Sequence, residues 1–127
     1  PQLQADCHDI GALASGRLLL SRNASLHWLL LVPDTEAIDL LDMPGDALAL
    51  VMRDCQRISQ WLKQAHAYPK VNFGALGNLV PQLHLHIVGR RPDDPCWPQP
   101  VWGNLPLGAA WPEGEIAAIR KALIHDN

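Results

Sequence analysis

Three polar residues alternate with apolar ones in a short segment of the chain. Gln82, His84 and His86 are separated by single leucines and followed by isoleucine and valine. Successive side chains of a β-strand point to opposite faces, so these three would share one face, roughly 6.5–7 Å apart. The apolar side chains would then face the core, and the amide and two imidazoles would face solvent, a ligand or a cleft.

A pair of imidazoles on one strand face is compatible with three roles. A neutral ring nitrogen can attack phosphorus and form a phosphoramidate intermediate. Two imidazoles at alternate strand positions can both reach one metal ion. The face can also be polar without any chemistry, each ring being satisfied by a neighbour. The spacing of His84 and His86 leaves all three roles open.

A loop with two glycines precedes the histidine segment, and Asn78 follows the second of them. In a functional interpretation the backbone near Gly77 approaches a phosphate closely, with Asn78 as a side-chain donor. In a structural interpretation the glycines serve a turn with positive φ.

The elements that would position these residues follow from apolar patterning. Two apolar runs, 17–22 and 26–32, flank a turn and predict a β-hairpin. Apolar residues recurring at steps of three and four predict an amphipathic helix over 45–66. Residues 70–73 and 83–88 read as strands, Arg90 and Arg91 as a solvated turn, and a last helix begins at Pro112. This order predicts an α+β fold with an antiparallel sheet.

Composition narrows the class of protein. The 127 residues predict one domain spanning 1–127, and 48% hydrophobic with 18% charged residues is typical of a folded chain. A net charge of -3 argues against binding duplex nucleic acid, and the longest apolar run is too short to cross a membrane. The sequence shows no positively charged segment followed by an apolar one at its start, as a signal peptide would have. Its three widely spaced cysteines suggest reduced thiols, so we expect a cytoplasmic protein.

Two segments carry a resemblance to a known family. Residues 71–78 contain two asparagines and two glycines, and residues 82–90 read Gln-Leu-His-Leu-His-Ile-Val-Gly-Arg. Together they resemble the histidine triad (HIT) superfamily, which is marked by a strand of three alternating histidines after a segment of this kind. Residues 97–100, Trp-Pro-Gln-Pro, resemble the Trp-Pro segment that follows the triad in its nucleotide-binding branch.

The resemblance implies a fold and a reaction. The fold would be HIT-like: an antiparallel sheet of about five strands, a long helix and a C-terminal helix, forming a homodimer through the long helix and an adjoining strand. The reaction would need no metal and no cofactor. His84, in the middle position, would attack the α-phosphate of a nucleotide and form a nucleotidyl-histidine, and His86 would hydrogen-bond the phosphate or the scissile oxygen. The backbone around Gln82 would orient the nucleophile, and Asn72 would line the same pocket.

The chain departs from the family pattern at three places, one of which lies just before the triad, where many relatives carry a Ser or Thr and residues 78–81 here read Asn-Leu-Val-Pro. Gln82 replaces the first histidine of the triad, and an amide can donate a hydrogen bond to phosphate but carries no proton for a leaving group. The family's further histidine, on an earlier strand, aligns with Trp28, with His27 one residue away. Because a one-residue shift reverses the face, either His27 or Trp28 faces the site. Trp97 is expected to contact a nucleobase or a second subunit.

The expected function is hydrolysis or transfer at the α-phosphate of a nucleotide conjugate, either a dinucleoside polyphosphate or a nucleoside phosphoramidate. One alternative is a nucleotide-binding module with little or no turnover, for which Gln82 and the unsettled position of His27 are the reasons. A second alternative is a metal-dependent enzyme that uses His84 and His86.

Overall fold

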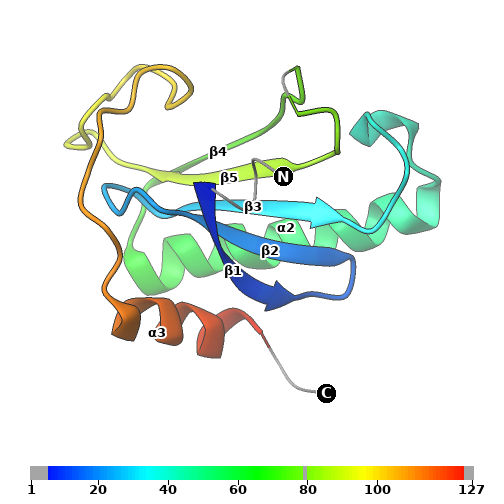
Figure 1. Cartoon of the computed structure of the whole chain (residues 1–127), viewed down its shortest axis with the longest axis horizontal. Coiled ribbons are helices and arrows are strands. Elements are labelled where there is room, and N and C mark those ends of the chain that lie inside the picture. The colour runs from blue at the N-terminus through cyan, green and yellow to red at the C-terminus, as the bar shows by residue number, and fades with distance from the viewer. Residues whose placement is uncertain (1–5, 79, 125–127) are drawn as a thin grey trace.

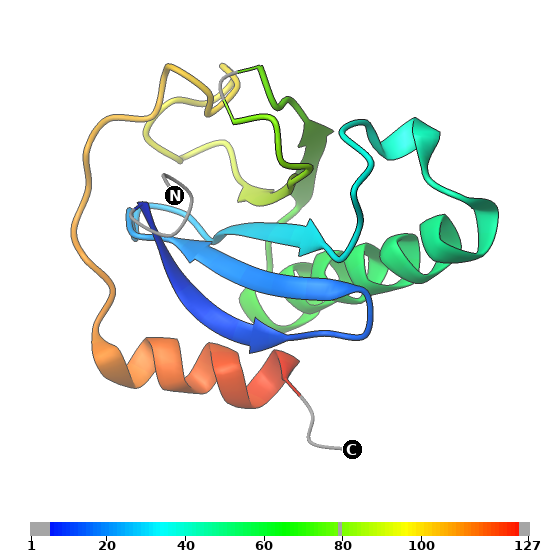
Figure 2. The same ribbon diagram turned by 45° about the vertical axis from the view of Figure 1, so that its right-hand side comes forward.

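Five antiparallel strands in the order β1-β2-β3-β5-β4 form the centre of the protein (Figures 1 and 2). The structure is a computed structural model that describes residues 6–78 and 80–124. In chain order the elements are β1 (Cys7–Ala12), β2 (Gly16–Ser21), β3 (Trp28–Pro33), the 3-10 turn η1 (Leu40–Asp42), α2 (Gly45–His66), β4 (Lys70–Ala75), β5 (Leu85–Arg90) and α3 (Glu113–Leu123).

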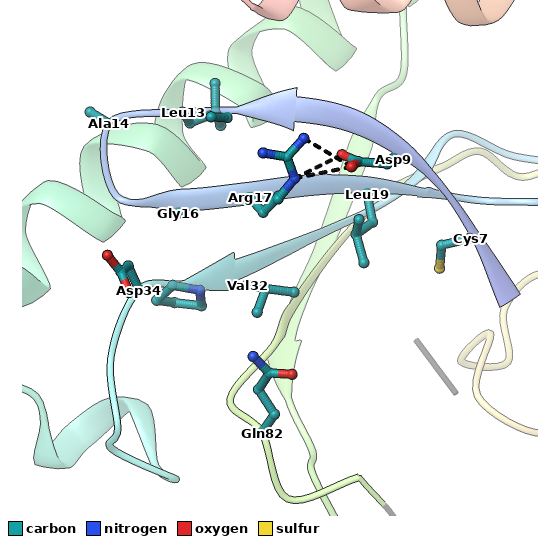
Figure 3. Close-up of a pocket in the computed structure, with 12 residues that line it drawn as sticks. Cys7, Asp9, Leu13, Ala14, Gly16, Arg17, Leu19, Val32, Asp34 and Gln82 are labelled. Carbon is teal, nitrogen blue, oxygen red and sulfur yellow. Dashed lines mark hydrogen bonds and ion pairs between the residues drawn. The ribbon is translucent and has the colours of Figure 1, made fainter. Parts of the chain in front are cut away.

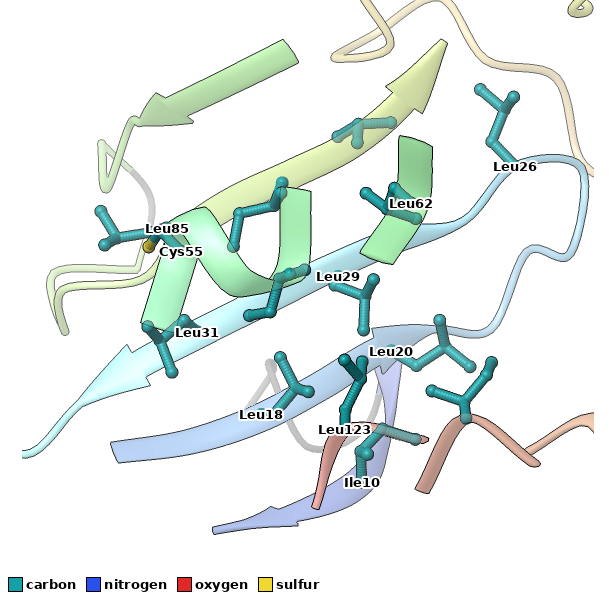
Figure 4. Close-up of a cluster of buried hydrophobic side chains, with 14 of the residues drawn as sticks. Ile10, Leu18, Leu20, Leu26, Leu29, Leu31, Cys55, Leu62, Leu85 and Leu123 are labelled. Carbon is teal, nitrogen blue, oxygen red and sulfur yellow. The ribbon is translucent and has the colours of Figure 1, made fainter. Parts of the chain in front are cut away.

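The two helices place the hydrophobic core on one face of the sheet, called the helix face below. Alternate apolar residues of the strands point to this face, where they meet the apolar side of α2 (Figure 4). Helix α3 lies along β1 and adds its own apolar residues to the same cluster. The strand residues of this core include Ile10, Leu18, Leu20, Leu29, Leu31, Leu85 and Ile87, and the helices add Val51, Cys55, Ile58, Leu62, Ile116, Ile119 and Leu123.

Helix α2 is fixed to the sheet at both ends. Its buried Asp54 accepts hydrogen bonds from the backbone N–H and the hydroxyl of Ser15, at 3.0 and 2.6 Å, and so holds the β1–β2 turn. The helix ends at Ala67, whose φ of 57° is left-handed and whose N–H bonds to the carbonyl of Leu62. The chain then turns back through Pro69 into β4, which pairs with β5.

The opposite face of the sheet, called the site face, carries Leu19, Leu30, Trp28 and His86 on neighbouring strands. The segment between β5 and α3 runs beside this face (yellow to orange in Figure 1). It is anchored by Arg90, only 1% exposed, whose guanidinium donates to Asp94 and to the carbonyl of Gln99. A cation at this depth persists only when paired, and here the carboxylate pairs it at 2.7 Å.

Most predicted elements are confirmed, and the exceptions have physical causes. The hairpin, the helix over 45–66, both later strands and the last helix are all present. Strand β1 was not predicted because its sequence, CHDIGA, lacks alternation and its pairing shifts between Asp9 and Gly11. The prediction that Arg90 lies in a solvated turn is wrong, since its side chain is buried in the ion pair with Asp94. Among the described residues, no helix is long and apolar enough to cross a membrane.

Candidate active site

His84 lies just before β5, where the predicted alternation continues without ladder hydrogen bonds. Both neighbours of β5 end their pairing at Leu85, so His84 lies beyond the paired part of the sheet. Leu83 is still buried in the core, and the imidazole of His84 still turns to the site face. Its Nδ1 lies 2.7 Å from the carbonyl oxygen of Gln82. Because a carbonyl only accepts, Nδ1 carries the hydrogen, and Nε2 of the neutral ring keeps its lone pair.

His86 lies next to His84, with ring centroids 5.1 Å apart. The two residues are 7% and 6% exposed. Burial and, to a smaller extent, the neighbouring His84 together lower the pKa of His86 to about 4. His86 is therefore a neutral imidazole over the physiological range.

Trp28 decides which nitrogen of His86 carries the hydrogen. The indole Nε1–H donates to Nδ1 of His86 at 3.0 Å. Trp28 pairs with Val88 and so shares the site face with His86. The two histidines thus have opposite tautomers: His84 offers a lone pair at Nε2, and His86 offers an N–H at Nε2.

Trp102, from the segment after β5, covers His86. Its ring meets His86 edge-on at 5.3 Å and Trp28 at 6.4 Å. Gly74 of β4 lies directly beneath it, since a Cβ at this position would be 3.4 Å from the indole. Nothing in the local sequence pattern shows that Trp102 folds back over β4.

A cavity of about 570 Å³ opens beside Gln82 on the site face (Figure 3). Its floor is formed by Leu19 and Val32, and the Gln82 side chain points toward it. The β3–β5 register pairs Leu31 with Leu85, and carried one residue further it sets His84 opposite Val32. The cavity reaches Val32 and Gln82, while neither histidine is among its lining residues. Sequence analysis missed it because β1, which forms its far wall, was not predicted.

The rim of this cavity is polar. Arg17 and Asp9 face each other across β1 and β2 and form a bidentate ion pair at 2.9–3.1 Å. Asp34 lies at the end of β3, and in Figure 3 its carboxyl points away from Gln82.

Asn72 and Trp97 lie toward the other end of β5. Asn72 lies two residues before Gly74 and shares the site face with it, and its Oδ1 accepts a hydrogen bond from Arg90 at 2.9 Å. Trp97 lies over the same guanidinium, 5.6 Å from ring centroid to Cζ. Arg90 thus links Asn72 on β4 to Trp97, which lies in the segment between β5 and α3 that covers the site face.

The structure does not bring His27 to the histidine pair. Its Nδ1 lies 2.8 Å from the Tyr68 hydroxyl, and its ring packs on His66 at the end of α2, with centroids 4.0 Å apart. Trp28 takes the place on the site face. The sequence left both residues possible, and the pairing of Trp28 with Val88 decides between them without a bulge in β3.

Gly77 and Asn78 lie in the loop between β4 and Gln82. Gly77 has a φ of +75°, as the turn interpretation expects, and Asn78 is exposed. That the Gly77 backbone and the Asn78 side chain bind a phosphate stays a prediction. Within residues 6–78 and 80–124, no three His, Cys, Asp or Glu side chains come together in a cluster that could hold a metal ion.

Comparisons with known proteins agree with this geometry. Residues 2–93 match the family model of the HIT domain. A search of curated protein sequences gave no significant match. A histidine triad protein from Bradyrhizobium japonicum is 40% identical with a TM-score of 0.87, covering 96% of this chain and 91% of its own. One from Sinorhizobium meliloti is 33% identical with a TM-score of 0.88, covering 97% and 91%. One from Marinobacter aquaeolei is 32% identical with a TM-score of 0.86, covering 97% and 90%. The family match over most of the chain, and the similarity to these three structures along nearly its whole length, show that this protein belongs to the HIT family.

Proposed function

We propose that the protein is a nucleotide hydrolase or transferase that acts at the α-phosphate of a nucleotide conjugate through a nucleotidyl-histidine. The observation that carries the proposal is the hydrogen bond from His84 Nδ1 to the Gln82 carbonyl. It directs the lone pair of Nε2 away from the backbone and orients it for attack on phosphorus. Attack leaves a positive charge on the ring, and the Gln82 carbonyl stabilises that charge through the same hydrogen bond.

His86 would act on the oxygens of the same phosphorus. Its Nε2 carries a hydrogen because Nδ1 accepts from Trp28. Negative charge grows on the phosphoryl oxygens in the transition state, and a donor fixed in advance stabilises it without reorganisation. The cavity beside Gln82 offers room for a nucleoside or for the leaving group, with an apolar floor and a polar rim.

A direct test is to trap the intermediate. The protein is mixed with a dinucleoside polyphosphate or a nucleoside phosphoramidate, quenched in alkali, which preserves phosphohistidine, and examined by mass spectrometry. We expect a nucleoside monophosphate on the peptide that contains His84. The His84→Asn variant should lose both adduct and turnover, whereas His66→Asn, a histidine on the helix face, should keep them. Turnover of wild-type size in His84→Asn would refute the proposal.

The binding-module alternative makes a different prediction in the same experiment. Gln82 supplies an amide where the family has an imidazole, and this favours binding over turnover. Tight nucleotide binding, measured by calorimetry, without adduct or released monophosphate would establish the module. The metal-dependent alternative has less support, because the described part of the chain supplies no third ligand beside the pair.

A further inference from the structure

The hydrogen bond between Trp28 and His86 limits what His86 can do. An indole nitrogen is a donor only and does not titrate, so at 3.0 Å it keeps Nδ1 of His86 as the acceptor. Protonation of His86 would require Nδ1 to give up this hydrogen bond. The ring is thereby held as a neutral Nε2–H donor rather than an imidazolium.

The surroundings of His86 reinforce this state. The described groups that face it are Leu30 on β3, Gly74 on β4, the indoles of Trp28 and Trp102, and His84. Only His84 can carry charge, and that charge would be positive. Burial and this neighbour lower the pKa of His86 to about 4. Nothing in this set favours an imidazolium.

The other residues around the scissile bond deliver no proton either. The Gln82 amide has none to transfer. The hydrogen on Nδ1 of His84 is bonded to the Gln82 carbonyl, and Nε2 is the attacking atom. On the cavity rim Asp9 is engaged by Arg17, and the Asp34 carboxyl points away from Gln82 (Figure 3). Among the described residues, the site provides hydrogen bonds but no general acid.

We propose that this site acts on nucleotide anhydrides, whose leaving group departs as a phosphate oxyanion, and discriminates against phosphoramidates, whose leaving group is an amine. This inference rests on the proposed function and names its substrate class. A phosphate chain is a stable anion and needs no proton to depart. An amine leaves only if its nitrogen gains a proton as the P–N bond breaks, and a general acid for that step contributes about 10²–10⁴-fold in rate.

The proposed steps balance as follows for an anhydride. The Nε2 lone pair of His84 forms a bond to the α-phosphorus, and the P–O bond breaks with its electron pair staying on the departing phosphate chain. Water then attacks the α-phosphorus, and the N–P bond breaks with its electron pair returning to the imidazole. The proton of that water passes to bulk solvent, and His84 returns to its neutral form.

The test compares two substrates with the same nucleoside: a diadenosine polyphosphate and an adenosine 5′-phosphoramidate of a simple alkylamine. We expect kcat/KM for the anhydride to exceed that for the phosphoramidate by at least about a hundredfold, the lower end of the general-acid effect. Comparable or faster phosphoramidate hydrolysis would overturn the substrate inference while the proposed function stands. If neither substrate is turned over, the proposed function fails and the substrate inference fails with it.

The hydrogen on His86 can be observed independently of activity. Long-range proton–nitrogen NMR of protein labelled at histidine should place it on Nε2, and a hydrogen on Nδ1 would overturn the inference. In Trp28→Phe we expect a mixture of tautomers, a raised His86 pKa, and a smaller anhydride-to-phosphoramidate ratio, most clearly at acidic pH. Trp61→Phe, which alters an indole on the helix face beside His27, should leave the tautomer and the ratio unchanged.

Discussion

Arg90 shows how one residue can hold a large part of the site together. Its guanidinium contacts Asp94, Asn72 and the carbonyl of Gln99, and Trp97 lies over its face. Burial alone would raise the pKa of Asp94, but the hydrogen bonds from Arg90 and from two backbone N–H groups bring it below its usual value. The ion pair is therefore formed throughout the neutral range.

Removal of one partner of this pair should be costly. We expect Asp94→Asn to lower the free energy of unfolding by about 3–5 kcal/mol, because it leaves the Arg90 cation buried without a counter-charge. The control is Asp9→Asn, which breaks the ion pair to Arg17, both side chains of which are more than half exposed. That change should cost no more than about 1 kcal/mol. Urea unfolding measures the free energy of unfolding of both variants, and an equal loss in the two would contradict the role given to Arg90.

Sequence reasoning at the level of single residues succeeded where the signal was periodic. The alternation of Gln82, His84 and His86 with apolar residues predicted their common face, and the structure keeps that alternation even beyond the paired strand. It failed for Arg90, because its burial depends on Asp94 and on a covering segment whose path has no local signature. Which of His27 and Trp28 faces the site required the register of β3 against β5.

At the level of elements, a helix or strand was predicted correctly where its own apolar periodicity was strong. Helix α2 has six turns of apolar periodicity and a proline after its end, and its bounds match the predicted 45–66. Strand β5 begins at Leu85 rather than at 83, because pairing requires neighbours and both neighbours stop at that point. Strand β1 has a short, bulged edge sequence, so its presence is decided by pairing with β2 rather than by its own pattern.

The junction of β3, α2 and β4 contains a second histidine pair. The Tyr68 hydroxyl accepts the backbone N–H of His27 at 3.0 Å, and its own hydrogen is thus available to Nδ1 of that residue. Burial, followed by the neighbouring His66 and Arg91, lowers the pKa of His27 to about 4. Arg91 lies over the Tyr68 ring. Burial and Arg91 also lower the pKa of His66, and the Glu115 carboxylate acts in the opposite direction.

This junction predicts a loss of stability in mild acid. The folded protein resists protonating His27, whereas the unfolded chain binds that proton near pH 6.5. Stability is therefore fully present above about pH 6.5 and falls toward pH 4, by at most about 1.4 kcal/mol per pH unit for each such histidine. His27→Gln should reduce the slope of unfolding free energy between pH 7 and pH 5. An unchanged slope in urea titrations of the variant would show that His27 titrates normally.

At the scale of the whole molecule, the two edges of the sheet differ. At one edge β1 is bulged and accompanied by α3. At the other edge β4 pairs with β5 and with no other strand of the described residues, so its outer side can accept a further strand. Beside this edge Phe73 is 44% exposed and Leu76 is 51% exposed. Exposed aromatic and leucine side chains next to an unpaired strand are typical of an interface.

We therefore propose that a second copy of the chain docks on the β4 edge, so that the two sheets become continuous and the α2 helices meet beside it. Phe73 points to the helix face, since it pairs with Ile87, and would be buried between the subunits. Light scattering after gel filtration should give twice the 14.0 kDa chain mass for the wild type. Phe73→Glu should give the single-chain mass, because the new carboxylate would lose its hydration in the interface without a partner. Leu107→Glu, at a residue that is 101% exposed in the segment before α3, should remain a dimer. A wild-type protein of single-chain mass would refute the dimer, and a dimer that tolerates Phe73→Glu would place the interface elsewhere.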